Sequence, residues 1–197
     1  QTDALERTGK LRGASLDRVR ALTRNMLVFS DEHKPRKTSV DINDTMISII
    51  RERQPLIDEQ KQAVISDFED NMPTVIGDPD DIRQAIMNLF DNAREAAEPK
   101  RGAISIGARF DEAGKRIIIR VNDNGRGMMP DELKDAFVPF RTSKQLKGAG
   151  LGLASARRVA QRYGGTVEIL ESERGKGTTI EMTLRAKRSK SGESEGG

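Results

Sequence analysis

The sequence of 197 residues contains no cysteine, no tryptophan, one tyrosine and one histidine. Without cysteine the chain forms no disulfide bond and binds no metal through thiolates. The single His33 lies in a polar segment, so neither a histidine metal cluster nor a Ser-His-Asp triad can be assembled. The scarcity of aromatic side chains leaves few surfaces on which nucleic-acid bases could stack. These absences exclude thiolate chemistry and argue against nucleic-acid binding.

Long hydrophobic runs are also absent. No apolar stretch reaches the roughly 18 residues that a membrane-spanning helix needs, and no signal peptide is visible. The 34 basic and 31 acidic residues nearly cancel, giving a formal net charge of +3, and the mean hydropathy is −0.63. We therefore expect a soluble chain with well-mixed charges. The first residue, Gln1, is unusual for a natural start and suggests a piece of a longer protein.

The sequence divides into four segments. Residues 1–32 carry apolar side chains at three- or four-residue spacing, which predicts an amphipathic helix over 15–30 that needs partner helices to bury its apolar face. That face consists of Leu16, Val19, Leu22, Met26 and Phe29. Polar residues 33–39 predict a linker, and residues 40–186 a globular domain. The charged, Ser/Gly-rich residues 187–197 predict a disordered tail.

Residues 40–186 alternate helix and strand signals and predict an α/β domain. The expected helices begin at Asn43 or Asp44, run from Asp78 or Asp80 to about Ala97, and span 130–136 and 150–163. The expected strands span 63–68, 74–76, 104–108, 117–121, 166–170 and 179–184.

The long helix that ends near Ala97 has one apolar and one polar side. The polar side carries Gln84, Asn88, Asn92 and Glu95. Asn88 and Asn92 are one turn apart and point the same way. A carboxamide oxygen is a hard, neutral ligand that suits Mg²⁺ bound to phosphate oxygens. The alternative interpretation is an ordinary solvated helix face.

A first glycine cluster, Asp123-Asn124-Gly125-Arg126-Gly127, directly follows an apolar strand. Glycines at such a junction allow positive φ and close approach of the backbone to a ligand. A carboxylate at this position can accept a hydrogen bond from an exocyclic amine such as adenine N6. The alternative is an Asx turn, in which Asp123 caps the local backbone.

A second glycine cluster, residues 148–153, leads into a helix. Glycine-rich entries to helices suit phosphate, and the cations Lys144 and Lys147 with Thr142 precede the cluster. A loop of this kind could close over a triphosphate. The alternative is an ordinary polar loop. The pattern is neither a Walker P-loop nor a Rossmann fingerprint, because it lacks G-K-[ST] and a correctly placed third glycine.

Together these segments resemble the ATP-binding domain of sensor histidine kinases, in the superfamily of gyrase, Hsp90, histidine kinase and MutL ATPases. Five motifs occur in the order of that family, and the spelling P-F-R-T-S-K is closest to the nitrogen-regulation kinases. The motifs are the N box at 82–93, the first glycine box at 123–128, the F box at 137–144, the second glycine box at 148–153 and the last glycine box at 175–179. The implied fold is an α/β (α+β) two-layer sandwich. In it, a mixed sheet carries helices on one face and follows a long helix from a dimerisation hairpin.

The resemblance implies a role for each matching residue. Asn92 would coordinate Mg²⁺, and Asn88 would support the metal and the phosphates. Asp123 would bind the adenine amine. The remaining ATP-binding residues would shape the adenine pocket or form the lid over the phosphates, with Lys144 acting in catalysis beside Asn88. They are Gly125, Gly127, Thr142, Lys144, Gly148, Gly150, Leu151, Gly152 and Thr178.

One position distinguishes the branches of the superfamily. The hydrolysing branches carry a water-activating glutamate where this sequence has Asn88, and a neutral amide is a poor general base. The resemblance therefore implies phosphoryl transfer from ATP to a histidine, for relay to a response-regulator aspartate. The family's phosphoacceptor motif is missing here, and His33 follows the amphipathic helix. The acceptor helix is thus expected outside this chain, which by itself would bind ATP without phosphorylating itself.

Two other functions remain open, namely a nucleotide-binding or dimerisation module without transfer activity and an anti-sigma-type serine kinase. As partners the resemblance implies ATP, a response regulator, the acceptor helix and, in the full-length protein, a second copy. Nucleic acid is not expected. The expected location is the cytoplasm, with membrane attachment only through regions outside this sequence.

Overall fold

The computed structural model describes residues 35–141 and 150–187. The predicted helix over 15–30, His33 and the predicted tail from residue 188 lie outside these ranges. In chain order the elements are β1 (Thr38–Val40), α2 (Ile42–Gln60), β2 (Ala63–Phe68), β3 (Thr74–Gly77), α3 (Pro79–Ala96), β4 (Ala103–Asp111), β5 (Arg116–Asp123), α4 (Pro130–Asp135), α5 (Gly152–Arg162), β6 (Val167–Glu173) and β7 (Gly177–Lys187).

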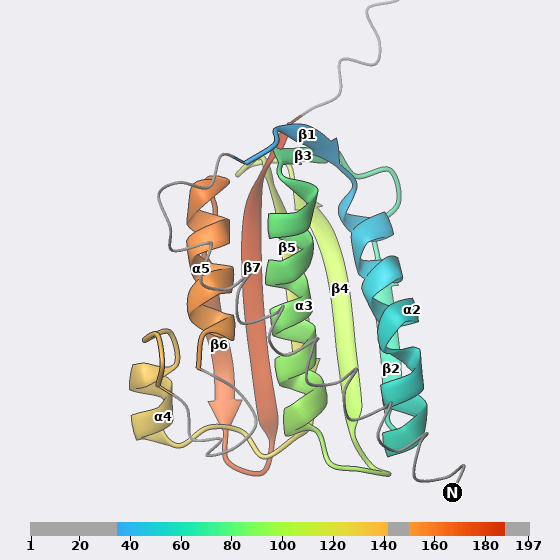
Figure 1. The fold of residues 1–197 in the computed structure, drawn as a ribbon, viewed down its shortest axis with the longest axis vertical. Helices are drawn as coiled ribbons and strands as arrows, with labels where there is room; N and C mark the ends of the chain where they lie inside the picture. Colours follow the sequence, from blue (N-terminus) through green and yellow to red (C-terminus); the bar gives the residue numbers. More distant parts are fainter. Residues whose placement is uncertain (1–34, 142–149, 188–197) are drawn as a thin grey trace, which may run out of the picture.

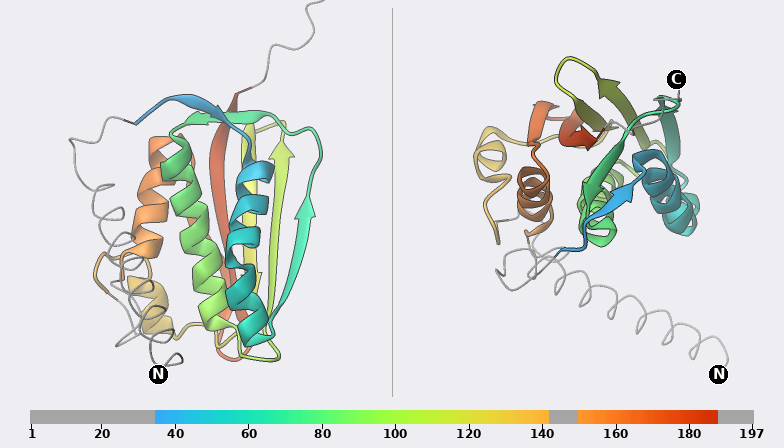
Figure 2. Two further views of the ribbon diagram at one scale, coloured as in Figure 1. Left: turned by 45° about the vertical axis from the view of Figure 1, so that its right-hand side comes forward. Right: turned by 90° about the horizontal axis from the view of Figure 1, so that it is seen from above.

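The strands form one mixed sheet in the order β1-β3-β7-β5-β4-β2, with β6 paired to β7. Only β2 and β4 run parallel, because α3 separates them in sequence and carries the chain back. Helices α2, α3 and α5 lie side by side on one face of the sheet (Figures 1 and 2). The predicted two-layer sandwich is therefore confirmed. None of the helices in the described ranges is long and apolar enough to cross a membrane.

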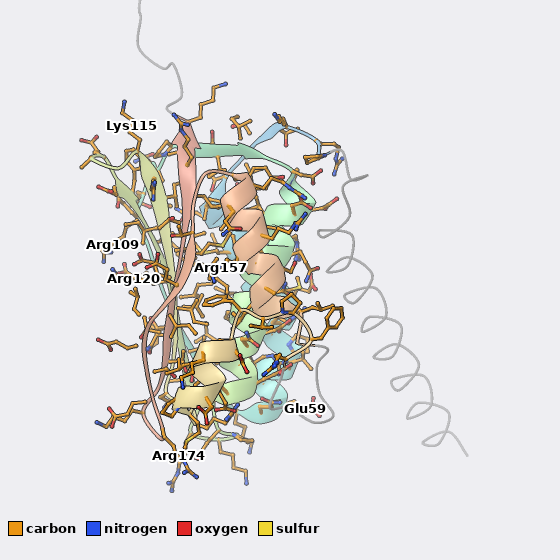
Figure 3. All side chains as sticks on the ribbon, turned by 90° about the vertical axis from the view of Figure 1, so that its left-hand side faces the viewer. Glu59, Arg109, Lys115, Arg120, Arg157 and Arg174 are labelled. Carbon is orange, nitrogen blue, oxygen red and sulfur yellow. The ribbon has the colours of Figure 1, made fainter. Side chains whose placement is uncertain are left out.

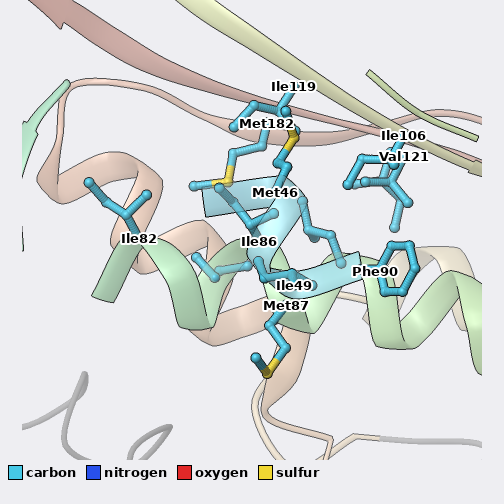
Figure 4. Packing of buried hydrophobic residues seen from close by; sticks show 14 of the residues in the cluster. Met46, Ile49, Ile82, Ile86, Met87, Phe90, Ile106, Ile119, Val121 and Met182 are labelled. Atoms are coloured by element: carbon cyan, nitrogen blue, oxygen red, sulfur yellow. The ribbon is translucent and has the colours of Figure 1, made fainter. Parts of the chain in front are cut away.

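The core lies between the sheet and the helices. Inward-facing side chains of β5, such as Ile117 and Ile119, are fully buried against Ile86 and Phe90 of α3. Figure 4 shows this cluster, with Met46 of α2 and Met182 of β7 closing it. The opposite face of the sheet is polar.

On that polar face, Arg109 pairs with Asp67 at 2.6 Å and Arg120 with Glu181 at 2.7 Å. Figure 3 shows both arginines pointing away from the helices. One apolar face per strand explains why the period-two pattern predicted β4 correctly.

Three details differ from the sequence predictions. Thr38 and Ser39, assigned to the linker, pair with β3 as part of β1, and β7 reaches Lys187, one residue into the predicted tail. Helix α2 begins earlier than expected, because the carboxylate of Asp41 accepts the N–H of Asp44 at 3.0 Å. The short edge strand β1 depends on its pairing with β3, which a local pattern does not reveal, and helix ends are uncertain by one or two residues where several residues could cap.

A polar network fixes α5 antiparallel to α3. The hydroxyl of Tyr163, just after α5, accepts the N–H of Asp78 at 3.1 Å and donates to Asp81 at 3.0 Å. Arg162 also donates to Asp81, at 2.8 Å. Asp78 caps α3, as predicted. Burial alone would raise the pKa of Asp78, but the backbone N–H groups of Arg36 and Asp80 and the guanidinium of Arg36 outweigh burial and lower it. These contacts join the C-terminal end of α5 to the N-terminal end of α3 and so fix how the two helices lie beside each other.

Candidate functional site

The first half of the polar side of α3 lies against α5, whereas Glu95 near its end is exposed. Gln84 is buried and donates from Nε2 to Oδ1 of Asn88 at 3.0 Å. Asn88 in turn donates from Nδ2 to the carbonyl oxygen of Gly152 at 3.2 Å. The interpretation as an ordinary solvated helix face therefore does not hold for Gln84 and Asn88, while Glu95 is exposed. The predicted N box and second glycine box meet at this hydrogen bond.

Asn92 lies one turn beyond Asn88 and is half-buried. No cluster of three or more histidine, cysteine or acidic side chains able to hold a metal occurs in residues 35–141 and 150–187. A divalent cation held at Asn92 would be bound by the amide oxygen together with oxygens of a ligand. Amide oxygens and phosphate oxygens are the hard donors that Mg²⁺ prefers, so the donor set at Asn92 fits that ion.

Asp123 ends β5 and is 4% exposed. Its Oδ1 accepts the N–H of Gly125 at 2.8 Å, so the Asx turn considered above is present. An ionised carboxylate offers about four lone-pair sites. The turn holds the carboxylate in one orientation.

The two glycines of the first cluster are required by neighbouring backbone. A Cβ on Gly125 would lie 2.1 Å from the carbonyl oxygen of Ala96, at the end of α3. A Cβ on Gly127, where φ is +64°, would lie 2.0 Å from the carbonyl oxygen of Glu173 at the end of β6. These close approaches draw the loop after β5 against both α3 and β6. The loop that directly follows Asp123 is therefore held in a fixed position.

Thr178 lies on β7 directly opposite Asp123 and is buried. Its hydroxyl is 2.9 Å from that of Ser172 on β6. A hollow of about 470 Å³ borders Thr178 without reaching Asp123 or Asn92. It is lined in part by Asn122, Ser172, Lys176 and Thr179. The structure thus brings Asp123, Gly125, Gly127 and Thr178 together.

The second glycine cluster is described only from Gly150. The carbonyl oxygen of Gly150 accepts the N–H of Phe140 at 3.1 Å, so the residues flanking 142–149 lie close together. Leu151 is buried and precedes the first turn of α5. The guanidinium of Arg157 on α5 lies 4.8 Å above the ring centre of Phe137 in the F box. The other predicted lid residues, Thr142, Lys144, Lys147 and Gly148, lie outside the described residues.

Two residues near the site were not singled out from the sequence. Gln84 lies on the predicted polar stripe, one turn before Asn88, and this spacing could have identified it as the support of Asn88. Ser172 gave no signal, because a β-bulge between Ile169 and Glu171 sets its direction.

Residues 77–188 match the family described as Histidine kinase-, DNA gyrase B-, and HSP90-like ATPase. The sensor histidine kinase ZraS of Escherichia coli K12 is 37% identical over 115 residues, which are 58% of this chain and 24% of ZraS. This chain thus spans about a quarter of that relative's length.

Two solved structures share the fold. ShkA, solved at full length in complex with AMPPNP, superposes with a TM-score of 0.77 at 24% identity, over 95% of this chain and 38% of ShkA. The histidine kinase ThkA in complex with the response regulator TrrA gives a TM-score of 0.70 at 19% identity, over 95% of this chain and 53% of that one. The family match covers more than half of the sequence. The chain therefore belongs to the family of histidine kinase-, DNA gyrase B- and HSP90-like ATPases, whose domain binds ATP.

Proposed function

We propose that this chain is the ATP-binding catalytic part of a two-component sensor histidine kinase. It would transfer the γ-phosphate of ATP to a histidine on a helix outside this chain, for relay to a response-regulator aspartate. The observation that carries the proposal is the hydrogen bond from Asn88 to Gly152. It joins the predicted metal-binding helix face to the N-terminus of α5, where the N–H groups of a first helical turn and the helix dipole favour phosphate.

The adenine end of the nucleotide would bind at Asp123 and Thr178. The Asp123 carboxylate would accept a hydrogen bond from the N6 amine. The hydrogen bond that it accepts from the Gly125 N–H keeps the carboxylate in place. The phosphate end would lie between α3 and the entry to α5. There Asn92 binds Mg²⁺ through its amide oxygen, and Asn88 supports the metal and the phosphates. When bound, Mg²⁺ neutralises charge on the phosphate oxygens.

The chemistry favoured by these residues is transfer to an external nucleophile. Catalysis then consists mainly of positioning and of charge neutralisation, with the acceptor imidazole as nucleophile. The neutral amide of Asn88 is a poor base for activating water. Lys144 and Thr142, if they close over the phosphates as the sequence predicts, would add positive charge and a donor. In the full-length protein a second copy would supply the rest of a dimerisation bundle.

Calorimetric titration with ADP and ATP tests the site. The wild type is expected to bind both, and Asp123→Asn to weaken both by about 10- to 150-fold, the value of one hydrogen bond to a charged group. Asn92→Ala should weaken ATP binding only when Mg²⁺ is present. The matched control is Asp111→Asn, since Asp111 closes a similar turn at the far tip of β4 through Ala113 and Gly114. Unchanged affinity in Asp123→Asn would refute the assignment.

Phosphoryl transfer is tested separately with [γ-³²P]ATP and histidine-bearing hairpin domains of sensor kinases. Label on the acceptor should be acid-labile and stable to base, as phosphohistidine is. The chain alone should acquire no stable label. Acid-stable label on an acceptor serine would instead favour the anti-sigma-type serine kinase.

A further inference from the structure

The hydroxyl of Ser172 joins two separate walls of the proposed adenine pocket. Its Oγ accepts the N–H of Met128, at the end of the first glycine box, at 2.9 Å. The same atom lies 2.9 Å from Oγ1 of Thr178, which follows the last glycine turn. One half-buried side chain on β6 therefore contacts the first and the last glycine box at once.

A β-bulge puts Ser172 in this position. Before the bulge, Ile169 pairs with Ile180; after it, Glu171 pairs with Thr179 and Ser172 with Thr178. With uninterrupted pairing, Glu171 would stand opposite Thr178, which itself lies opposite Asp123 on the other side of β7. The extra residue turns the glutamate to the other face of the sheet and brings a hydroxyl inward. Bulges are frequent next to active sites, where they redirect a side chain in this way.

The hydrogen atoms at this contact can be counted. A hydroxyl has one hydrogen to donate and two lone pairs. Ser172 already uses one lone pair for the Met128 N–H. If Ser172 gives its hydrogen to Thr178, the hydrogen of Thr178 becomes available to a ligand. If Thr178 gives its hydrogen to Ser172, Thr178 can only accept.

The purine edge distinguishes these two arrangements. Adenine presents an N6 amine that donates, and guanine an O6 that accepts. The neighbouring N1 accepts in adenine and carries a hydrogen in guanine. A pocket that accepts at Asp123 and donates at Thr178 therefore matches adenine, and both contacts oppose guanine. Thr178 can donate to the base only when Ser172 gives its own hydrogen to Thr178.

We propose that Ser172 is a positioning residue for adenine recognition. It donates its hydrogen to Thr178 and thereby directs the Thr178 hydroxyl, as a donor, toward N1 of the base. Its bond to Met128 holds the first glycine box at a fixed distance from β6. This inference rests on the proposed function, in which Asp123 and Thr178 face the adenine, and assigns the polarity of that pocket to a residue outside the five sequence motifs.

Calorimetry with ADP and 1-deaza-ADP, which lacks only N1, tests the proposal. The wild type should bind ADP about 3- to 10-fold more tightly than 1-deaza-ADP, the value of one neutral hydrogen bond. Ser172→Ala should lose most of this preference, because it weakens the binding of ADP more than that of 1-deaza-ADP. Ser172→Thr keeps a hydroxyl in a strand-compatible side chain and should restore the preference. Ser105→Ala, on the polar face of β4 and equally half-buried, is the matched control and should change neither affinity.

The ratio of the two affinities separates positioning from support. If Ser172 merely held the fold, Ser172→Ala would weaken both ligands by the same factor, and this result overturns the proposal. An unchanged ratio in Ser172→Ala overturns it as well. A wild type that binds ADP without preferring it to 1-deaza-ADP rejects the role of Ser172 and leaves the nucleotide site standing. Failure of the wild type to bind ADP at all rejects both.

Discussion

The bridge formed by Tyr163 offers a direct test of how α3 and α5 are held together. Tyr163 is 8% exposed, and its hydroxyl accepts from the backbone of Asp78 and donates to the carboxylate of Asp81. Tyr163→Phe removes both hydrogen bonds and leaves the ring in place. Asp81 keeps its bond from Arg162, but the buried N–H of Asp78 loses its side-chain acceptor.

The expected loss of stability follows from that unmet donor. A buried polar group left without a partner costs about 2 kcal/mol. For a domain of this size, this corresponds to a decrease in Tm of about 4–8 °C. Thermal unfolding at neutral pH, followed by circular dichroism, measures the change. An equal Tm for the variant and the wild type would show that the bridge contributes nothing.

The same hydroxyl predicts a pH dependence. Burial, and then the Asp81 carboxylate, raise the pKa of Tyr163 to about 12, although the Asp78 N–H and Arg162 act in the opposite direction. The unfolded chain has the ordinary value of about 10. The folded state therefore favours the neutral phenol, and this contribution to stability is complete below pH 10. It is lost as the pH rises from about 10 to about 12.

The composition makes this titration simple to measure. Tyr163 is the only tyrosine and there is no tryptophan, so the ultraviolet absorbance of phenolate reports this one group. The midpoint should lie near 12 in the folded protein and near 10 in concentrated urea. Tyr163→Phe should lack the part of the alkaline stability loss that the wild type shows between these values. A midpoint near 10 in the folded protein would refute the buried bridge.

Substitutions at three further positions test packing and helix geometry. Gly125→Ala should lower ADP affinity at least about tenfold, since its Cβ would lie 2.1 Å from the Ala96 carbonyl oxygen and overpacking costs about 1–3 kcal/mol; calorimetry would contradict this with wild-type affinity. Arg53→Ala should cost about 1–2 kcal/mol in urea unfolding, because it breaks a two-bond pair with Asp91 at 2.9 and 3.0 Å, and Arg53→Lys should recover less than half. Pro55→Ala should raise the free energy of unfolding by about 1–2 kcal/mol, because Pro55 lies inside α2 and cannot donate to the helix; a loss of stability would count against that reasoning.

The sequence predicted the order of the elements in residues 40–186 well, because each element depends on a local pattern. The alternation in β4 and the apolar stripe of α3 were confirmed. Asp123 was expected at the end of a strand and is found there. Such features need only a period, a cap or a glycine that the sequence itself contains.

The features that were missed depend on contacts between distant segments. The polar stripe of α3 alone does not reveal that α5 contacts it at Asn88, since the hydrogen bond to Gly152 joins residues 64 positions apart. The first two residues of β1 were assigned to a linker because their strand character comes from pairing with β3. The bulge in β6 depends on register with β7, and so the inward direction of Ser172 could not be read from alternation.

The structure also changes what the glycines of the motifs mean. They were expected to let backbone approach a ligand, but at Gly125 and Gly127 the space for a Cβ is taken by carbonyl oxygens of α3 and β6. Gly152 is different, because a Cβ there would meet Asn88 only at an ordinary 3.7 Å. The first glycine box therefore packs the end of β5 closely against α3 and β6, and this packing fixes the orientation of Asp123. A side chain at Gly152 would therefore meet Asn88 without a clash, at the entry to α5 where the phosphates are proposed to bind.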